Sequence, residues 1–357
     1  MQTLKMAVVG VGALGRHHAR ILSQMESIDL VAVADPNEQQ GRAVAESTGS
    51  AWTADYHELI TRVDAASIVV PTFLHRTVAS AFLEAGVPVL VEQPLAGNVP
   101  DGEALVELAS TKSIPLQVGH VERFNPTFQK LQAVTGAARY IRAERLSPYA
   151  FRSMDIGAVH DLMIHDIDLI LSLVDSPVVR VEALGACVVG GHEDVVQARL
   201  GFENGCLADL TANRVCPQPR RTLQVWSETG CIDADLHQRK ITEYRPGAAL
   251  LAGELPFDLA AQPGADIAAL KQQIFERFIT ITESSAADDD ALTSELSSFV
   301  AAVRQNATPI VDGAQALSAL RVAGRIIESL HQHRWDGDAD GRTGPHAHPI
   351  HGNRRAA

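Results

Sequence analysis

The stretch "VVGVGALGRHH" (8–18) decides the fold of this chain of 357 residues. An apolar run leads into Gly10-x-Gly12-x-x-Gly15, and a helical pattern follows. The glycine pattern alone is a weak signal. Here Asp35 also ends the next apolar run, about 20 residues after Gly15, which is the spacing of a dinucleotide-binding fingerprint. This context disfavours the alternative, a glycine-rich turn without a ligand.

Each residue of the fingerprint has a physical role. Gly10 permits a tight turn, Gly12 lets the backbone approach a pyrophosphate, and Gly15 lets the helix pack on the strand. The helix N-terminus offers N–H groups to the phosphates. Asp35 can accept hydrogen bonds from both ribose hydroxyls and would repel a 2′-phosphate, and Pro36 follows it. The sequence therefore favours NAD over NADP as the cofactor.

Apolar runs and helical patterns alternate up to about residue 120. Strands are predicted at 6–10, 29–35, 66–72, 87–93 and 115–120, with helices between them at 13–24, 37–48, 75–86 and 99–112. Strands that are apolar throughout and separated by helices form a parallel sheet covered on both faces. We predict a Rossmann domain over 1–121, with Pro71, Thr72 and His75 at its ligand-binding carboxyl edge. N-capping of the next helix is an equally good interpretation of Thr72.

The pattern changes after about residue 121. A helix at 158–174 precedes strands near 179–189, 194–203, 206–214, 220–228, 231–236 and 239–244, and helices follow at 293–305 and 312–333. Turns are expected at Asn204-Gly205 and Thr229-Gly230. We predict an α/β domain over 122–335 with an antiparallel meander. The acidic segment 284–292 is predicted to be a solvated loop that favours the following helix N-terminus.

Residues 336–357 are rich in Gly, Pro, His and Arg and show no periodicity. We predict a disordered tail there. His346, His348 and His351 are weak candidates for metal binding, and no functional metal site is predicted.

The bulk properties limit the classes of partner. The formal net charge is −13 without a long Lys/Arg run, which argues against nucleic acid or a membrane surface. No apolar run approaches the roughly 20 residues of a membrane span, and the N-terminus reads as a strand rather than a signal peptide. The four cysteines lack CxxC spacing. We interpret them as reduced thiols of a cytoplasmic protein, with zinc binding as a distant alternative.

The helix at 158–174 is apolar nearly all round except for one polar stripe. Asp161, His165 and Asp168 are spaced i, i+4 and i+7, so they share a face. Ionisable groups on a buried helix require a reason, and catalysis is favoured over a structural Asp–His pair or a metal site. His165 suits a base that removes the proton of an alcohol while hydride leaves the carbon. Asp161 would orient its imidazole.

Five further residues are weaker candidates for the site. His120 ends the fifth strand, where it would lie near a nicotinamide or bond to backbone. Arg123 and Asn125 follow it and would contact substrate or close the domain junction. Arg152 and Arg214 are candidates for gripping a diphosphate, because arginine binds phosphate bidentately, or are surface charges.

Several of these motifs together resemble the Gfo/Idh/MocA oxidoreductases, named for glucose–fructose oxidoreductase and inositol dehydrogenase. The resemblance runs in order to about residue 335 and is carried by "GVGALGRHHARIL", "VADPN", "VPTFLH", "VEQPLA", "GHVERFNP" and "DLMIHDIDLIL". With "LSPYAFRSMD", the last two look most like the branch that oxidises UDP-N-acetylglucosamine at its 3-hydroxyl. The resemblance implies a Rossmann domain, a second α/β domain with a large open sheet, and homodimers or homotetramers formed through that sheet.

The resemblance also implies three polar positions around the reacting carbon. Two are the Asp and His of an Asp-x-x-x-His pattern, which fall on Asp161 and His165. The third is the Lys of a Glu-Lys-Pro motif, and here Gln93 stands in its place between Glu92 and Pro94. An amide donates a hydrogen bond but carries no charge and releases no proton near neutral pH. Losing a charged donor costs on the order of 2–4 kcal/mol of transition-state stabilisation if nothing substitutes.

Two functions are consistent with these residues. The first is an NAD-dependent dehydrogenase acting on a sugar or sugar nucleotide, with His165 as base and Gln93 positioning substrate. The second is a non-catalytic sensor or scaffold that binds NAD and a sugar nucleotide. The predicted catalytic residues are His165, Asp161 and Gln93. The predicted cofactor-binding residues are Gly10, Gly12, Ala13, Leu14, Gly15, Asp35, Pro71, Thr72, His75, Glu92, Gln93 and His120. The predicted substrate-binding residues are Gln93, Arg123, Asn125, Arg152, Asp161, His165 and Arg214.

Overall fold

The structure is a computed structural model and describes residues 3–151, 155–189, 191–335 and 342–347. The chain forms two compact units, and neither is continuous in sequence. The first unit comprises Met1–Phe124, Phe151–Asp168 and Asp289–Glu328, and the second comprises Asn125–Ala150, Leu169–Asp288 and Ser329–Ala357. The predicted division placed a single boundary at about residue 121. In the structure, two later segments, Phe151–Asp168 and Asp289–Glu328, belong to the first unit. In the described ranges, no helix is both long and apolar enough to cross a membrane.

The first unit contains the predicted parallel sheet. Its described strands run in the order β3-β2-β1-β4-β5-β6, and every neighbouring pair is parallel. This is the strand order of a doubly wound Rossmann sheet. The sequence missed one short strand, "AWT", because three residues are too few to show a pattern. The strands are β1 (Leu4–Val9), β2 (Ile28–Ala34), β3 (Ala51–Thr53), β4 (Ala65–Ile68), β5 (Val89–Glu92) and β6 (Leu116–Gly119).

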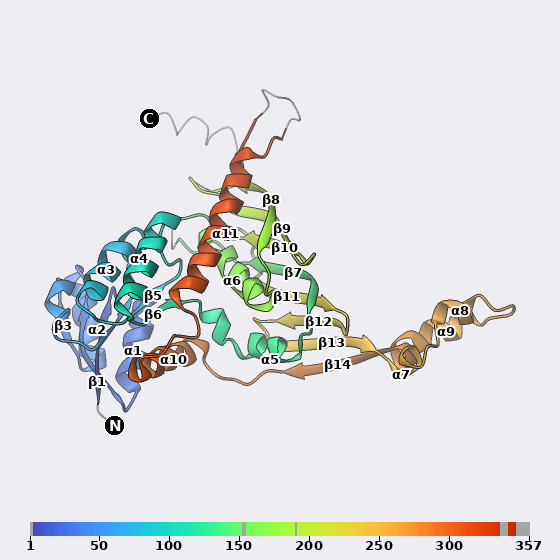
Figure 1. The fold of residues 1–357 in the computed structure, drawn as a ribbon, viewed down its shortest axis with the longest axis horizontal. Helices are drawn as coiled ribbons and strands as arrows, with labels where there is room; N and C mark the ends of the chain where they lie inside the picture. Colours follow the sequence, from blue (N-terminus) through green and yellow to red (C-terminus); the bar gives the residue numbers. More distant parts are fainter. Residues whose placement is uncertain (1–2, 152–154, 190, 336–341, 348–357) are drawn as a thin grey trace. The chain divides into compact units, whose positions relative to one another are not determined.

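Four helices connect these strands close to the predicted positions, and Figure 1 shows them grouped around β1 to β6. Asn37 and Asn98 cap two of them, each accepting a hydrogen bond from a backbone N–H three residues on. The helices are α1 (Gly15–Gln24), α2 (Glu38–Thr48), α3 (His75–Glu84) and α4 (Val99–Lys112), with short 3-10 turns η1 (Tyr56–Leu59), η2 (Thr72–Leu74) and η3 (Val121–Phe124).

Helix α10 (Ala291–Gln305) explains why a late part of the chain belongs to the first unit. The predicted acidic cap is confirmed, because Asp290 accepts a hydrogen bond from the backbone N–H of Thr293 at 3.0 Å. Leu296 and Phe299 then pack into the core formed by β1, β2 and α1. Helix α11 (Gly313–Gln332) follows and begins in the same unit.

The predicted helix at 158–174 differs at its start. Its first turn is a π-helix, η4 (Val159–Met163), and regular α-helix begins only with α6 (Ile164–Leu173). Single π turns inside helices are common at functional sites. The prediction that Asp161 and His165 share a helix face assumed 3.6 residues per turn. Because Asp161 lies in a wider π turn, that spacing does not hold for it.

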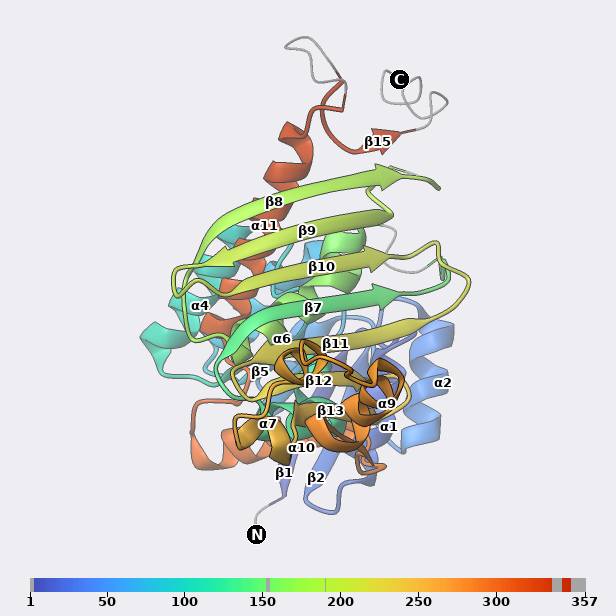
Figure 2. The same cartoon turned by 90° about the vertical axis from the view of Figure 1, so that its right-hand side faces the viewer.

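The second unit is built on a large, mostly antiparallel sheet, as predicted, which Figure 2 shows with its strands side by side. The order is β14-β13-β12-β11-β7-β10-β9-β8-β15. The described strands are β7 (Ala138–Leu146), β8 (Val178–Cys187), β9 (Val195–Phe202), β10 (Leu207–Asn213), β11 (Arg220–Ser227), β12 (Gly230–Asp235), β13 (Lys240–Pro246), β14 (Ile279–Ser285) and β15 (His346–Ala347).

The simple meander is wrong, because β7 lies between β10 and β11 and pairs in parallel with β10. The predicted turns are confirmed. Gly205 and Gly230 both have positive φ, and a Cβ at Gly230 would lie 2.1 Å from the carbonyl oxygen of Tyr244. Part of the predicted solvated loop at 284–292 belongs to β14 instead.

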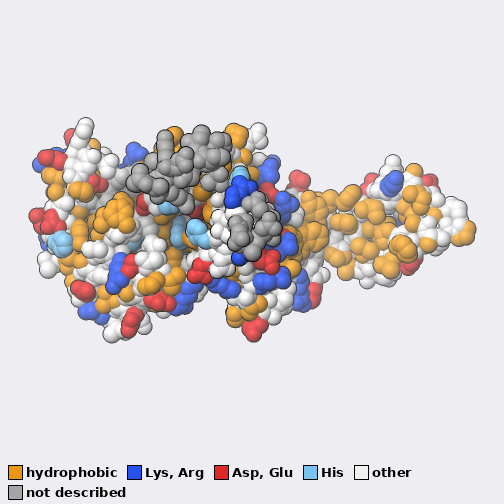
Figure 3. Space-filling model, turned by 90° about the horizontal axis from the view of Figure 1, so that it is seen from above, with side chains coloured by type: hydrophobic (Ala, Val, Ile, Leu, Met, Phe, Trp, Pro, Cys, Tyr) orange, Lys and Arg blue, Asp and Glu red, His pale blue; other side chains and the backbone are white. Residues whose placement is uncertain are grey.

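Helices flank this sheet. Helix α5 (Pro126–Val134), which the sequence missed, packs on β12 and β13. Between β13 and β14 the chain forms an arm of α7 (Ala248–Leu251), α8 (Pro256–Ala260), α9 (Ile267–Gln273) and the π turn η5 (Ile274–Phe278). Figure 3 shows that the surface of this arm is largely apolar. Leu251, Phe257 and Phe275 are among its exposed side chains.

One part of the predicted disordered tail has regular structure. His346 and Ala347 form β15, which pairs in parallel with β8, and Thr343 bridges to Arg334. A strand of two residues is too short to produce a periodic pattern in the sequence, so it could not be predicted. Residues 336–341 and 348–357, which include His348 and His351, lie outside the described residues.

Candidate active site

The fingerprint glycines of the first unit have the geometry that a bound dinucleotide requires. Gly10 has φ +84°, and a Cβ there would lie 2.4 Å from the carbonyl oxygen of Val69. A Cβ at Gly15 would lie 1.9 Å from the carbonyl oxygen of Gly10, so no larger residue fits. Gly12 faces open space, which leaves room for a ligand against its backbone. The residues present therefore fit a dinucleotide.

The N-terminus of α1 can receive the phosphates. Leu14 is at the N-cap and makes no side-chain cap, and the first turn carries no acidic residue. Backbone N–H groups at such an end bind anions, and the helix dipole adds to this. Ala13 and Leu14, both predicted contacts, form the turn that leads into the helix.

Asp35 lies at the end of β2, as predicted, and is buried. Its Oδ2 accepts hydrogen bonds from the backbone N–H of Val11 at 2.9 Å and from Gln40 Nε2 at 3.0 Å. Its Oδ1 accepts one from the backbone N–H of Asn37 at 2.8 Å. The carboxylate thus ties the glycine loop to β2. Since each oxygen can accept more than one hydrogen bond, it also keeps capacity for ribose hydroxyls.

The loop after β4 contains Pro71, Thr72 and His75. Thr72 does not cap α3, because Leu74 is at that N-cap and no side chain caps it. His75 is buried, with Nδ1 2.8 Å from the carbonyl oxygen of Pro94 and Nε2 2.9 Å from that of Val70. Burial is the main cause that lowers the pKa of His75. The ring therefore joins the loops after β4 and β5, and any effect of His75 on the cofactor acts through the position of these loops.

Strand β5 delivers Glu92 and Gln93 to the carboxyl edge of the sheet. Glu92 is buried, and its Oε2 accepts a hydrogen bond from the backbone N–H of Gln93 at 3.1 Å. Its carboxylate lies over Gly119, where an added Cβ would be 2.8 Å from both oxygens. The Gln93–Pro94 peptide bond is cis. In the described part of the chain, the buried Oε1 of Gln93 has no hydrogen-bond partner.

His120 and His165 come together at this edge. The rings meet edge to face with centroids 6.4 Å apart, although 45 positions separate the two residues in sequence. His120 is buried, and neither of its ring nitrogens has a partner among the described residues. Burial, and secondarily Arg123, lowers the pKa of His120 against opposing contributions from Asp168 and Glu92. His120 is therefore a neutral imidazole that can both donate and accept a hydrogen bond.

Arg123 and Asp168 form the charged wall of the site. Arg123 Nη1 lies 3.4 Å from Asp168 Oδ1, and both side chains are nearly buried. Asp168, the third residue of the polar stripe, thus faces Arg123. This contact uses part of the hydrogen-bonding capacity of Arg123, which was predicted to bind substrate. Asp161 lies in the π turn η4 and is half-buried, as is His165 at the start of α6.

The remaining predicted substrate residues have other partners or lie elsewhere. Asn125, in the second unit, caps α5 by accepting from the N–H of Thr127 at 2.9 Å, and its Nδ2 donates to the carbonyl oxygen of Leu236 at 3.3 Å. Arg214 is a buried partner of Asp194, with Nε 2.8 Å from Oδ1. This pair uses Arg214 within the second unit, so it is neither a surface charge nor an open phosphate site. Arg152 lies outside the described residues.

Two buried residues close to Glu92 were not among the residues predicted from the sequence. His18 lies on α1, three residues after Gly15, and Glu295 lies on α10. One nitrogen of His18 and one carboxylate oxygen each of Glu92 and Glu295 lie within 4.8 Å of one another. The signal for His18 was a histidine on the buried face of a helix, but no sequence pattern places Glu295 near β5.

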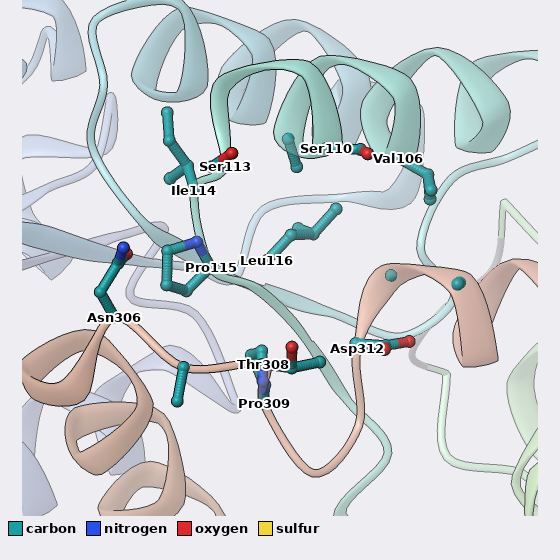
Figure 4. A pocket seen from close by; sticks show the side chains of 14 residues that line it. Val106, Ser110, Ser113, Ile114, Pro115, Leu116, Asn306, Thr308, Pro309 and Asp312 are labelled. Atoms are coloured by element: carbon teal, nitrogen blue, oxygen red, sulfur yellow. The ribbon is translucent and has the colours of Figure 1, made fainter.

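A cavity of about 390 Å³ in the first unit lies away from these groups. Figure 4 shows it between the C-terminal end of α4, the start of β6 and the segment joining α10 to α11. Ser110, Ser113 and Asp312 are among its lining residues. It is at the amino end of β6, whereas ligands of such sheets bind at the carboxyl ends. The candidate active site is therefore the group of Gln93, His120 and His165, and this cavity is not part of it.

The fold and the fingerprint define a dinucleotide-binding α/β protein with a second domain built on an open sheet. Comparison with known families gives the same class. Residues 4–120 match the oxidoreductase family with an NAD-binding Rossmann fold, and residues 130–233 match the GFO/IDH/MocA C-terminal domain. The chain therefore belongs to the Gfo/Idh/MocA oxidoreductase family, as its motifs predicted.

Curated relatives and solved structures narrow this class. The chain is 36% identical over 251 residues to UDP-N-acetylglucosamine 3-dehydrogenase of Acidithiobacillus ferrooxidans, covering 70% of this chain and 80% of that protein. It is 35% identical over 231 residues to the myo-inositol dehydrogenase Hyg17 of Streptomyces leeuwenhoekii, covering 60% and 71%. A solved structure of UDP-N-acetylglucosamine 3-dehydrogenase GnnA from Acidithiobacillus ferrooxidans aligns with a TM-score of 0.80 at 30% identity, covering 92% and 98%.

Proposed function

We propose that this protein is an NAD-dependent dehydrogenase that moves a hydride between a sugar-nucleotide hydroxyl carbon, C3 of UDP-N-acetylglucosamine, and nicotinamide. The observation that carries this proposal is the meeting of His165 with the unpartnered, neutral His120 at the carboxyl edge of a dinucleotide-binding sheet. The likeness to a UDP-N-acetylglucosamine 3-dehydrogenase supports the substrate class.

In the proposed mechanism the protein handles the proton. His165 accepts the proton of the substrate hydroxyl, and Asp161 orients its ring and stabilises its charged form. Gln93 and His120 offer neutral hydrogen-bonding groups to the reacting oxygen. NAD, held by Gly10 to Gly15 and Asp35, supplies the hydride acceptor.

We also propose NAD rather than NADP as the cofactor. Asp35 is held in place by Val11, Asn37 and Gln40 and cannot turn away from a ribose at the end of β2. Its carboxylate would repel a 2′-phosphate. Arg42, the first arginine after it, lies at 4.4 Å from the ring centroid of Trp52, where it makes a cation–π contact.

We propose that the protein acts in the cytoplasm as a homodimer or homotetramer. Trp226 on β11 supports the use of the sheet of the second unit as the interface, because this large apolar side chain is 48% exposed on the face opposite the buried Leu223 and Val225.

A spectrophotometric assay tests the proposed function. UDP-N-acetylglucosamine, related UDP-sugars and inositols are offered with NAD or NADP, and reduced cofactor is followed by absorbance. We expect turnover with the UDP-sugar and a preference for NAD. His165→Asn should lower kcat by about 10²–10⁴-fold because the proton acceptor is lost. Exposed His57→Asn is the matched control and should leave kcat unchanged.

The outcomes separate the two functions that the sequence left open. Turnover that survives His165→Asn contradicts the role of His165. Tight binding of NAD and UDP-sugar without turnover by the natural protein supports a sensor or scaffold, which the uncharged Gln93 favours.

A further inference from the structure

Beneath Gln93, three ionisable side chains of the first unit meet in a place closed to water. They are His18 from α1, Glu92 from β5 and Glu295 from α10, and their relative exposures are 0%, 7% and 0%. Two carboxylates this close cannot both keep a full charge in a buried site unless they are compensated. The protonation states of the group are therefore coupled.

Glu92 has the partners of an ionised carboxylate. His18 Nε2 lies 3.1 Å from its Oε1, and the backbone N–H of Gln93 donates to its Oε2. His18 is anchored on its other side, where Nδ1 lies 2.9 Å from Ser67 Oγ. Polar groups thus face both carboxylate oxygens of Glu92.

Glu295 has the surroundings of a neutral acid. In the described residues, neither of its carboxylate oxygens has a hydrogen-bond partner. Burial and the nearby Glu92 and Asp168 raise the pKa of Glu295 well above its usual value. Among the described residues, the charged or titratable groups around it include Glu92 from β5, His18 from α1 and Asp168 from α6, the last paired with Arg123 of η3.

The backbone at Glu295 is also fixed. Gln117 Nε2, on β6, donates to the main-chain oxygen of Glu295 at 3.0 Å, and Leu296 packs into the core next to it. The carboxyl group cannot leave by a small movement of α10. A buried O–H requires an acceptor, and one carboxylate oxygen of Glu92 lies within 4.8 Å of one oxygen of Glu295.

We propose that Glu295 is a positioning residue of the active site, a neutral carboxylic acid that holds the ionised Glu92 in place. Glu92 in turn holds the backbone of Gln93 and fills the space over Gly119. Glu295 therefore sets the place of the Gln93 side-chain amide. This inference rests on the proposed function for its catalytic consequence, and on the burial of Glu295 and the carboxylates around it for its protonation.

The protonation is tested by infrared spectroscopy on the full-length protein. At neutral pH we expect a carboxylic acid C=O band from a buried protonated group, present in the natural protein and absent in Glu295→Gln. Glu107→Gln, an exposed change on α4, is the matched control and should retain the band. A band that persists in Glu295→Gln overturns the assignment.

Stability against pH gives a second readout that needs no activity. Because the pKa of Glu295 is raised on folding, its stabilising contribution is complete below the usual glutamate pKa and is lost as the pH rises through the folded value. Glu295→Gln should therefore flatten the alkaline fall in Tm, whereas Glu107→Gln should follow the natural protein. Identical alkaline profiles for the natural protein and Glu295→Gln contradict the proposal.

The positioning role is tested by kinetics. Glu295→Gln keeps a neutral donor of the same size, so kcat should stay within about threefold, whereas Glu295→Leu should lower kcat by about tenfold or more with little change in KM. Equal losses in both variants overturn the role. A divalent metal bound at one per chain and lost in Glu295→Gln, measured by mass spectrometry, would also overturn it. If the natural protein shows no turnover, the proposed function fails while the infrared and Tm tests still decide the protonation of Glu295.

Discussion

At the scale of single residues, the proposed active site depends on Gln93. It directly follows the buried strand β5, its backbone N–H donates to Glu92, and its Oε1 is buried without a partner in the described residues. A buried acceptor without a donor is costly, so the arrangement is suited to a ligand that brings an O–H group. This is what a substrate hydroxyl would supply. The neutral His120 close by provides a second hydrogen-bonding group without adding charge.

Restoring the charge at this position tests how the site works without it. Gln93→Lys places an ammonium next to the ionised Glu92, where it is electrostatically favoured. If the lost donor limits catalysis, kcat should rise by about 10–10²-fold. The measurement is the rate of NAD reduction with saturating UDP-sugar, with the exposed Gln315→Lys on α11 as a control for added charge. An unchanged or lower kcat would mean that the site is adapted to the amide.

At the scale of elements, the protein places its polar groups with helices that come from distant parts of the chain. Helix α1 carries His18, α6 carries His165 and Asp168, and α10 carries Glu295. The apolar faces of these helices pack on the sheet or its core, as Leu296 and Phe299 of α10 do, and the polar positions are thereby held with little freedom. Stability of α10 is thus a condition for the site.

The N-cap of α10 offers a test of this link. Asp290 accepts hydrogen bonds from the backbone N–H and the hydroxyl of Thr293. Asp290→Ala should lower the free energy of unfolding by about 1 kcal/mol because the cap is lost. The free energy is measured by urea denaturation. Asp289→Ala, one residue earlier and without a cap, should change it by less than about 0.5 kcal/mol.

At the scale of the whole molecule, the sheet of the second unit presents a surface that a single chain does not cover. Trp226 lies on it beside Gln224, and its Nε1 donates to Gln224 Oε1 at 3.2 Å. Alternation along β11 places Leu223 and Val225 on the buried face and Trp226 on the open one. The exposed apolar arm of α7 to η5 belongs to the same unit.

The proposed oligomer gives a direct prediction. Trp226→Glu should shift the protein toward the monomer, because a carboxylate in an apolar interface is not solvated. Light scattering after size-exclusion chromatography measures the mass. Phe73→Ser, an exposed apolar change in the first unit, should leave the mass unchanged. A natural protein that is already monomeric would contradict the oligomer proposal.

The sequence by itself determined the elements whose signals are local. Gly10 and Gly15 leave no room for a side chain, and Gly12 leaves space for a ligand. The four helices and the main strands of the Rossmann sheet follow from the hydrophobic periodicity. Family motifs added the class of protein and the place of Gln93. These signals were readable because each depends on residues close together in the chain.

Only the tertiary structure decided what depends on pairing and packing over long separations. It inserted β7 between β10 and β11, turned the start of the 158–174 helix into a π turn, and paired Arg123 with Asp168 and Arg214 with Asp194. It also brought Glu295 to Glu92 across about 200 residues, which no periodicity encodes. The physical reason is that a buried charge is governed by whichever groups surround it in space, and the order of the chain does not record them.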